Sequence, residues 1–152
     1  MPRTSAGLLL YRRAPGLEVL LGHMGGPFWA RKDEAAWSVP KGEYEAGDEA
    51  FAVALREFEE ELGTPVPADR FLALGEVKQS GGKVLMAWAA EGDLDAAAAH
   101  SNTFTLEWPP RSGRMQEFPE VDRAAWVSPD SARAKLVKGQ VAFVDRLVER
   151  LG

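Results

Sequence analysis

The segment that decides the fold is Gly42 to Thr64, with the sequence GEYEAGDEAFAVALREFEEELGT. It holds eight acidic residues around a single base, Arg56, which is far more negative charge than a solvated helix needs. Successive helical residues are rotated by about 100°, so Glu57, Glu60 and Glu61 at i, i+3 and i+4 share one face. Carboxylates crowded in this way repel each other. We therefore expect a cation to offset the repulsion.

The identity of that cation follows from the ligand type. Mg²⁺ takes oxygen ligands, keeps several waters and is usually held by a few carboxylates together with substrate phosphate. The cluster therefore favours phosphate chemistry with Mg²⁺, for which Mn²⁺ is an alternative ion. A second interpretation needs no metal, because a charged outer face is common on amphipathic helices.

Signals for the ends of this helix lie inside the same segment. We expect Asp48 to cap the first turn and Glu49 to add negative charge at the positive end of the helix dipole. Gly63 predicts the end, with Pro65 just beyond it. Glu59 lies off the acidic face and is interpreted as solvated surface. An apolar stripe that would pack on a core is formed by Phe51, Leu55, Phe58 and Leu62.

The segment resembles the Nudix box, a glycine-bounded pattern of Arg-Glu and Glu-Glu pairs at fixed spacing. Two positions depart from the pattern, because Asp48 stands where the family has Glu and Thr64 where it has an aliphatic residue. The preceding residues Trp37 to Gly42, WSVPKG, are similar to the strand and turn that lead into such boxes. The matching positions are Gly42, Arg56, Glu57, Phe58, Glu60, Glu61 and Gly63.

The resemblance implies a role for each of these residues. Glu57, Glu60 and Glu61 would be metal ligands together with the backbone carbonyl of Lys41, and Glu57 is the first candidate to position or deprotonate the attacking water. Arg56 would orient one box carboxylate, because a guanidinium fixes carboxylate geometry; its alternative role is a solvated arginine. The Lys41 side chain would contact phosphate or be a solvated turn lysine.

In some Nudix enzymes the catalytic base comes from a later loop. Glu117 and Glu120 in the segment MQEFPEVD are the candidates here. A base of this kind typically contributes about 10² to 10⁴ in rate. The alternative is that these two residues pair with Arg114 or Arg123 at the surface.

Composition predicts one compact enzyme domain over residues 1–152. The apolar content of 45% is enough for a core, and the formal charge of −5 does not favour long nucleic acid. There is no cysteine, hence no disulfide framework and no thiolate metal site. The apolar run Gly7 to Leu10 is too short for a signal peptide or a membrane span. We expect a cytoplasmic protein without a membrane partner, either a monomer or a homodimer.

Alternating patterns predict strands around the box helix and a mixed sheet with helices on both faces. The Nudix resemblance implies an α/β/α sandwich. Two segments are expected to be loops, Gly25 to Ala36 and Asp95 to Gly113. A helix starts at Ser128-Pro129-Asp130 and a covering helix follows over Gln140 to Leu151. The strands are expected at Ser5 to Arg12, Leu17 to His23, Phe71 to Lys78, Lys83 to Ala90 and Ala124 to Val127.

Few other residues suggest a site. Trp29 and Trp108 lie near loops and are candidates for substrate contact, whereas Trp88 and Trp126 are expected to pack. His23 and His100 have no partner at a metal-binding spacing, so packing or surface roles are expected. Scattered basic residues would line a polyphosphate site or be solvated. They are Lys78, Lys83, Arg111 and Arg114.

The expected function is a Mg²⁺-dependent hydrolase of phosphoanhydride bonds in nucleoside diphosphate-linked compounds. Pro40 to Gly42 resembles the Pro-Lys-Gly lead-in of family members that act on dinucleoside polyphosphates, which implies these substrates slightly ahead of nucleoside triphosphates. The alternative is a nucleotide-sensing or regulatory module with little turnover, although such modules tend to lose the box acids that this chain keeps. A third possibility is an isomerase on the same scaffold, as in the isopentenyl diphosphate isomerases. That family resemblance implies a catalytic cysteine, and this chain has no cysteine, which disfavours an isomerase.

Overall fold

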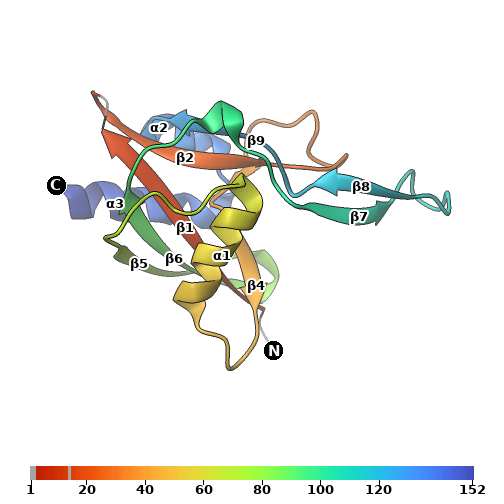
Figure 1. Ribbon diagram of the computed structural model, residues 1–152, viewed down its shortest axis with the longest axis horizontal. Helices are drawn as coiled ribbons and strands as arrows, with labels where there is room; N and C mark the ends of the chain where they lie inside the picture. Colours follow the sequence, from red (N-terminus) through yellow and green to blue (C-terminus); the bar gives the residue numbers. More distant parts are fainter. Residues whose placement is uncertain (1–2, 14) are drawn as a thin grey trace.

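The computed structural model describes residues 3–13 and 15–152 (Figure 1). Its helices are α1 (Ala50–Leu62), α2 (Pro129–Lys135) and α3 (Val141–Leu151), and the short 3-10 turns are η1 (Ser80–Gly82), η2 (Ala96–Ala98) and η3 (Lys138–Gln140). The strands are β1 (Thr4–Arg13), β2 (Leu17–Met24), β3 (Trp37–Ser38), β4 (Lys41–Tyr44), β5 (Leu72–Lys78), β6 (Val84–Glu91), β7 (Thr103–Glu107), β8 (Met115–Pro119) and β9 (Val121–Val127).

The main sheet is mixed, as the sequence predicts. Its strand order is β3-β2-β1-β6-β5, with β4 beside β1 and β9 beside β2. Only the β1–β6 pair is parallel among these pairs, whereas the predicted hairpins β1–β2 and β5–β6 are antiparallel. The predicted strand before α2 is also present as β9.

Strands β1 and β2 separate after their hairpin, and the chain before the box lies in the fork. Their pairing runs from Tyr11 opposite Val19 to Arg13 opposite Leu17. Further along, β4 pairs with the start of β1 and β3 pairs with the end of β2. A Cβ at Gly7 would lie 2.8 Å from the Pro40 carbonyl oxygen, so glycine permits this close approach. The fork places Lys41 and Gly42 at the centre of the sheet.

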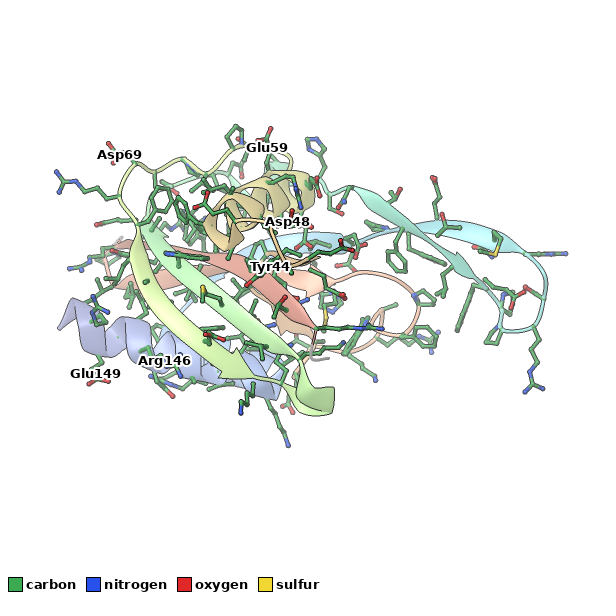
Figure 2. All side chains as sticks on the ribbon, turned by 90° about the horizontal axis from the view of Figure 1, so that it is seen from below. Tyr44, Asp48, Glu59, Asp69, Arg146 and Glu149 are labelled. Carbon is green, nitrogen blue, oxygen red and sulfur yellow. The ribbon has the colours of Figure 1, made fainter. Side chains whose placement is uncertain are left out.

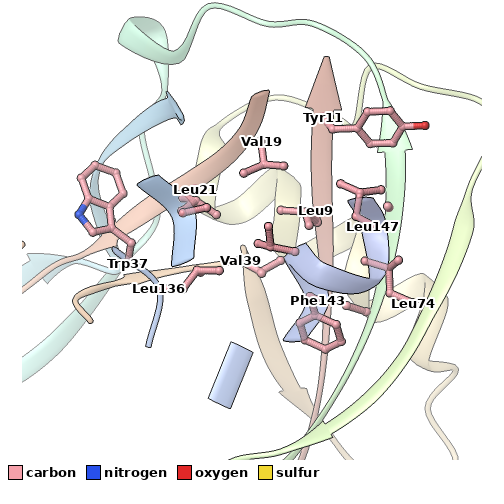
Figure 3. Close-up of a cluster of buried hydrophobic side chains, with 14 of the residues drawn as sticks. Leu9, Tyr11, Val19, Leu21, Trp37, Val39, Leu74, Leu136, Phe143 and Leu147 are labelled. Carbon is pink, nitrogen blue, oxygen red and sulfur yellow. The ribbon is translucent and has the colours of Figure 1, made fainter. Parts of the chain in front are cut away.

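Helices cover both faces of the sheet, which confirms the predicted α/β/α arrangement (Figure 2). Alternate residues of β1 point to opposite faces. Leu8 and Leu10 belong to the same buried cluster as Phe58 of α1. Leu9 lies in the opposite cluster with Phe143 of α3 (Figure 3). A strand buried on both faces needs the nearly continuous apolar run that β1 carries.

The start of α1 differs from the sequence prediction. The N-cap residue is Glu49, whose side chain makes no capping hydrogen bond, and the Asp48 carboxylate instead accepts from the backbone N–H of Glu45 at 3.1 Å. Gly47, with a φ of 98°, turns the chain there and leaves Asp48 one residue before the cap. The end is as predicted, because Gly63 adopts the left-handed conformation and its N–H donates to the Glu59 carbonyl.

The predicted loop over residues 95–113 is wrong in part. It contains η2 and strand β7, which pairs with β8 in a separate two-stranded hairpin that extends away from the main sheet (Figure 1). The five-residue alternation Thr103–Glu107 is short and is followed closely by two prolines, so its pattern was weak against the loop signals around it. Among residues 3–13 and 15–152, no helix is long and apolar enough to cross a membrane.

Candidate active site

The glycine that opens the box makes room for the first box carboxylate. Gly42 lies on β4, and the Glu57 side chain of α1 lies directly against it. A Cβ built at Gly42 would be 1.8 Å from Glu57 Oε1, far inside van der Waals contact. Any larger residue at this position would displace the carboxylate. The spacing between the glycine and the glutamate in the sequence therefore has a direct steric cause.

Glu61 lies one turn after Glu57 and turns toward the same strand. Its Oε1 accepts a long hydrogen bond of 3.4 Å from the backbone N–H of Lys41. Burial raises the pKa of Glu61 to about 8, and the charges of Glu57 and Glu120 act in the same direction. The Lys41 ammonium and backbone N–H lower this pKa but do not outweigh burial. The folded protein therefore holds a carboxyl group that lacks a sufficient positive partner.

Glu57 shows the same imbalance. Burial raises its pKa to about 7, followed by a hydrogen bond with the Glu60 carboxyl group and by the charge of Glu60. Arg56 lowers this pKa less than those effects raise it. Arg56 itself lies 3.8 Å from Glu60, Nε to Oε1, with both side chains exposed. Arg56 thus contacts one box carboxylate, whereas Glu59 is exposed on the outer side of α1 (Figure 2).

Glu120 joins the box carboxylates from the junction of β8 and β9. Its backbone N–H donates to the Asn102 carbonyl at 2.9 Å, and its own carbonyl accepts from the Gly25 N–H at 2.9 Å. The Asn102 N–H in turn donates to the Glu60 carbonyl at 2.8 Å near the end of α1. This chain of backbone hydrogen bonds fixes Glu120 beside the last turn of α1.

Glu61 and Glu120 line one small cavity of about 160 Å³, which we call the acidic cavity. It lies where β4, the end of α1, the end of β2 and the β8–β9 junction meet. Glu57 stands next to it on Gly42 and acts electrostatically on Glu61. The lining residues are Met24, Gly25, Trp29, Ser38, Lys41, Glu61, Phe104, Glu120 and Val121.

Glu117, the other late candidate, is placed differently. It is exposed on β8, opposite Thr105 of β7, and it does not line the acidic cavity. The structure therefore brings Glu120 to Glu61 and leaves Glu117 on the projecting hairpin. The sequence could not separate the two, because they are only three residues apart.

A second cavity of about 430 Å³ adjoins the first, and we call it the lysine cavity. The two cavities share Met24, Trp29 and Lys41. Of the four scattered basic residues, only Lys83 lines this cavity beside Lys41, and Lys138 of η3, which the sequence did not indicate, lines it too. The only feature of the local sequence that could have indicated Lys138 is the Lys138-Gly139 pair just before the last helix. The lining residues are Met24, Trp29, Lys41, Gln79, Ser80, Lys83, Val137, Lys138, Gly139 and Gln140.

The loop that carries Trp29 is tied to β9 by a buried histidine. His23 is fully buried, with Nε2 2.6 Å from the Lys32 carbonyl oxygen and Nδ1 2.9 Å from Asp122 Oδ1. The packing role predicted for His23 is confirmed. Trp29 lines both cavities, whereas Trp108 packs edge-on against Phe28 and lines neither.

The donor set fits a hard divalent cation. Carboxylate oxygens of Glu57, Glu61 and Glu120 converge with little positive charge to offset them, and such oxygens are the ligands of Mg²⁺ and Mn²⁺. In the described part of the chain, no three histidine, aspartate or glutamate side chains are arranged to hold a metal ion as they stand. Mg²⁺ keeps several waters and shares substrate phosphate, so a complete protein cage is not required.

A family model described as NUDIX domain matches residues 1–147. The chain therefore belongs to the Nudix family, which confirms the resemblance read from residues 42–64. The α/β/α sandwich described above, with the box helix packed against a mixed sheet, agrees with this family assignment.

Individual relatives are more distant. The chain is 40% identical to an RNA pyrophosphohydrolase from Rhodospirillum rubrum over 65 residues, which cover 41% of this chain and 39% of that relative. Among solved structures, a C. elegans Ap4A hydrolase binary complex has a TM-score of 0.62 at 19% identity, covering 97% of each chain. The NUDIX domain of Shewanella oneidensis NrtR, complexed with ADP ribose, has a TM-score of 0.67 at 17% identity and covers 100% of this chain and 90% of that one. Identities this low support the fold alone.

Proposed function

We propose that this protein is a divalent-cation-dependent pyrophosphohydrolase that cleaves a phosphoanhydride bond in a nucleoside diphosphate-linked compound, with Mg²⁺ as the ion. The observation that carries the proposal is the convergence of Glu57, Glu61 and Glu120 beside Lys41. The RNA pyrophosphohydrolase that matches part of the chain at 40% identity supports the same reaction class.

Each residue has a defined task in this reaction. Glu57, Glu60 and Glu61, with the Lys41 carbonyl, would hold the ion. The ion would acidify a bound water and neutralise the charge that develops on the phosphate oxygens. Glu120 faces the cavity from the opposite element and is our candidate for the proton acceptor, and Glu57 is the second candidate. The Lys41 side chain supplies positive charge to the departing phosphate.

The test is a screen of nucleoside polyphosphates and nucleoside diphosphate-linked compounds with Mg²⁺, following product masses. We expect cleavage at a phosphoanhydride bond, a loss of about 10² to 10⁴ in kcat for Glu57→Gln, and ¹⁸O from labelled water in one phosphate product. The matched control is Glu59→Gln, which removes the same charge from the same helix outside the cavity. Binding of nucleotide without turnover at high enzyme concentration would contradict the proposal and favour a sensing module.

A further inference from the structure

Half of the lysines in an acidic protein line one cavity. The chain has six lysines and a formal charge of −5, and Lys41, Lys83 and Lys138 all line the lysine cavity. None of its ten lining residues is acidic. Within residues 3–13 and 15–152 these three lysines form no ion pair, whereas Lys135 is paired with Asp33 at 2.9 Å. Positive charge is therefore available in this cavity for a ligand.

A buried glutamine fixes further donors at the same place. Gln140 is fully buried, and its Oε1 accepts from the Val39 backbone N–H at 2.9 Å. Its Nε2 must then point away, and it donates to Ser38 Oγ at 3.0 Å and to Gln79 Oε1 at 3.2 Å. The Gln79 amide is thereby oriented by its oxygen, which leaves its NH₂ group to donate to a ligand in the cavity. A cavity lined by hydrogen-bond donors suits a ligand that is rich in hydrogen-bond acceptors.

The turn η3 also lines this cavity. Lys138 and Gly139 lie in η3, which leads directly into the 11 residues of α3. Gly139 is held close to Gln79, because a Cβ there would lie 2.9 Å from Gln79 Cγ. The residues of η3 thus face the same space as Lys83 and the oriented Gln79 amide.

The position of the cavity connects it to the reaction. It shares Lys41, Met24 and Trp29 with the acidic cavity, so an extended ligand can occupy both. We propose that the lysine cavity binds a phosphate run that continues beyond the bond being cleaved, so that the substrate carries at least three consecutive phosphates. This inference rests on the proposed function. A two-phosphate bridge would be used up at the acidic cavity and would leave the lysines without an anion.

The experiment compares substrates that differ in phosphate number. The double variant Lys83→Gln/Lys138→Gln removes two charges at exposed positions, and Lys78→Gln is the matched control because Lys78 is exposed on β5 but does not line the cavity. KM and kcat are measured with diadenosine tetraphosphate, ATP and ADP-ribose. We expect the double variant to raise KM at least about tenfold for the first two, and far less for ADP-ribose. A preference for diadenosine tetraphosphate would indicate a dinucleoside substrate, and a preference for ATP would indicate a mononucleoside substrate.

A binding measurement that needs no turnover separates this inference from the proposed function. Calorimetric binding of inorganic tripolyphosphate in the presence of chelator needs no turnover, and we expect wild-type binding that weakens about tenfold in the double variant and falls with added salt. Turnover of nucleotides without any binding of tripolyphosphate would overturn the inference alone. Equal KM increases for ADP-ribose and diadenosine tetraphosphate would also overturn it. Lysine-dependent binding without hydrolysis of any substrate would instead overturn the proposed function.

Discussion

The acidic cavity and the lysine cavity adjoin each other and share three lining residues, yet they carry opposite charge. Glu61 and Glu120 line the first, and Lys83 and Lys138 line the second. The acids come from the box helix and the β8–β9 junction, while the lysines come from the β5–β6 turn and from η3. Separate elements therefore supply separate charges. Under the proposed function, the first cavity would hold a cation and the second an anionic part of the substrate.

Besides Glu57→Gln, the largest effect is expected from the other candidate base, Glu120, in the acidic cavity. Glu120→Gln keeps the shape of the side chain and removes its charge, so we expect kcat to fall about 10²-fold if Glu120 accepts the proton. Glu117→Gln is the matched control on β8, and we expect less than a twofold change because that side chain is exposed outside the cavity. Steady-state rates with Mg²⁺ check both. A larger loss from Glu117→Gln would place the catalytic group on the projecting hairpin.

The next largest effect is expected from disrupting the contact between β4 and α1, which positions Glu57 beside the acidic cavity. Gly42→Ala adds a Cβ where Glu57 Oε1 lies, so we expect a loss of about 1 to 3 kcal/mol in unfolding free energy and at least a tenfold loss of kcat. Gly16→Ala is the control, since nothing lies within 4 Å of its added Cβ. Denaturant unfolding measures the first effect. Shortening Glu57 to Ser in the Gly42→Ala protein should restore stability but not activity.

A smaller effect concerns pH in the absence of metal. Because the pKa of Glu61 is raised from 4.5 to about 8, the folded state holds a proton that the unfolded chain releases. This group therefore favours unfolding progressively as pH rises from about 4.5 to about 8. With chelator present, we expect Glu61→Gln to be more stable than wild type at pH 8 by at least about 1 kcal/mol, with little such gain at pH 4.5. Glu59→Gln should show no such difference. An identical pH dependence in wild type and Glu61→Gln would contradict the assigned burial.

The two cavities also differ in how far the sequence could predict them. The box helix, its end at Gly63 and its buried stripe follow from local spacing, and Glu57 and Glu61 lie within that spacing. Glu120 and Glu117 were equivalent in the sequence, because long-range backbone contacts with Asn102 and Gly25 decide which one lies beside α1. Strand β7 itself was missed, since a five-residue alternation beside prolines is a weak signal.

The lysine cavity depends on contacts between distant parts of the chain. Lys41, Lys83 and Lys138 are brought together by the sheet order and by the packing of η3 near β5, and no local pattern links them. The helix start was also mispredicted at Asp48, because the turn at Gly47 moved the cap by one residue. Local patterns thus predicted which carboxylates share one face of the box helix, while long-range topology decided the rest of the site.

The most direct test of the account is the binding of a divalent cation to the folded protein without substrate. Mn²⁺ is titrated by electron paramagnetic resonance into wild type, Glu61→Gln and the Lys83→Gln/Lys138→Gln variant, with Mg²⁺ as competitor. We expect wild type to bind the ion, Glu61→Gln to bind it at least tenfold more weakly, and the lysine variant to bind it at least as well as wild type. Unchanged binding in Glu61→Gln, or no binding in wild type, would contradict the account.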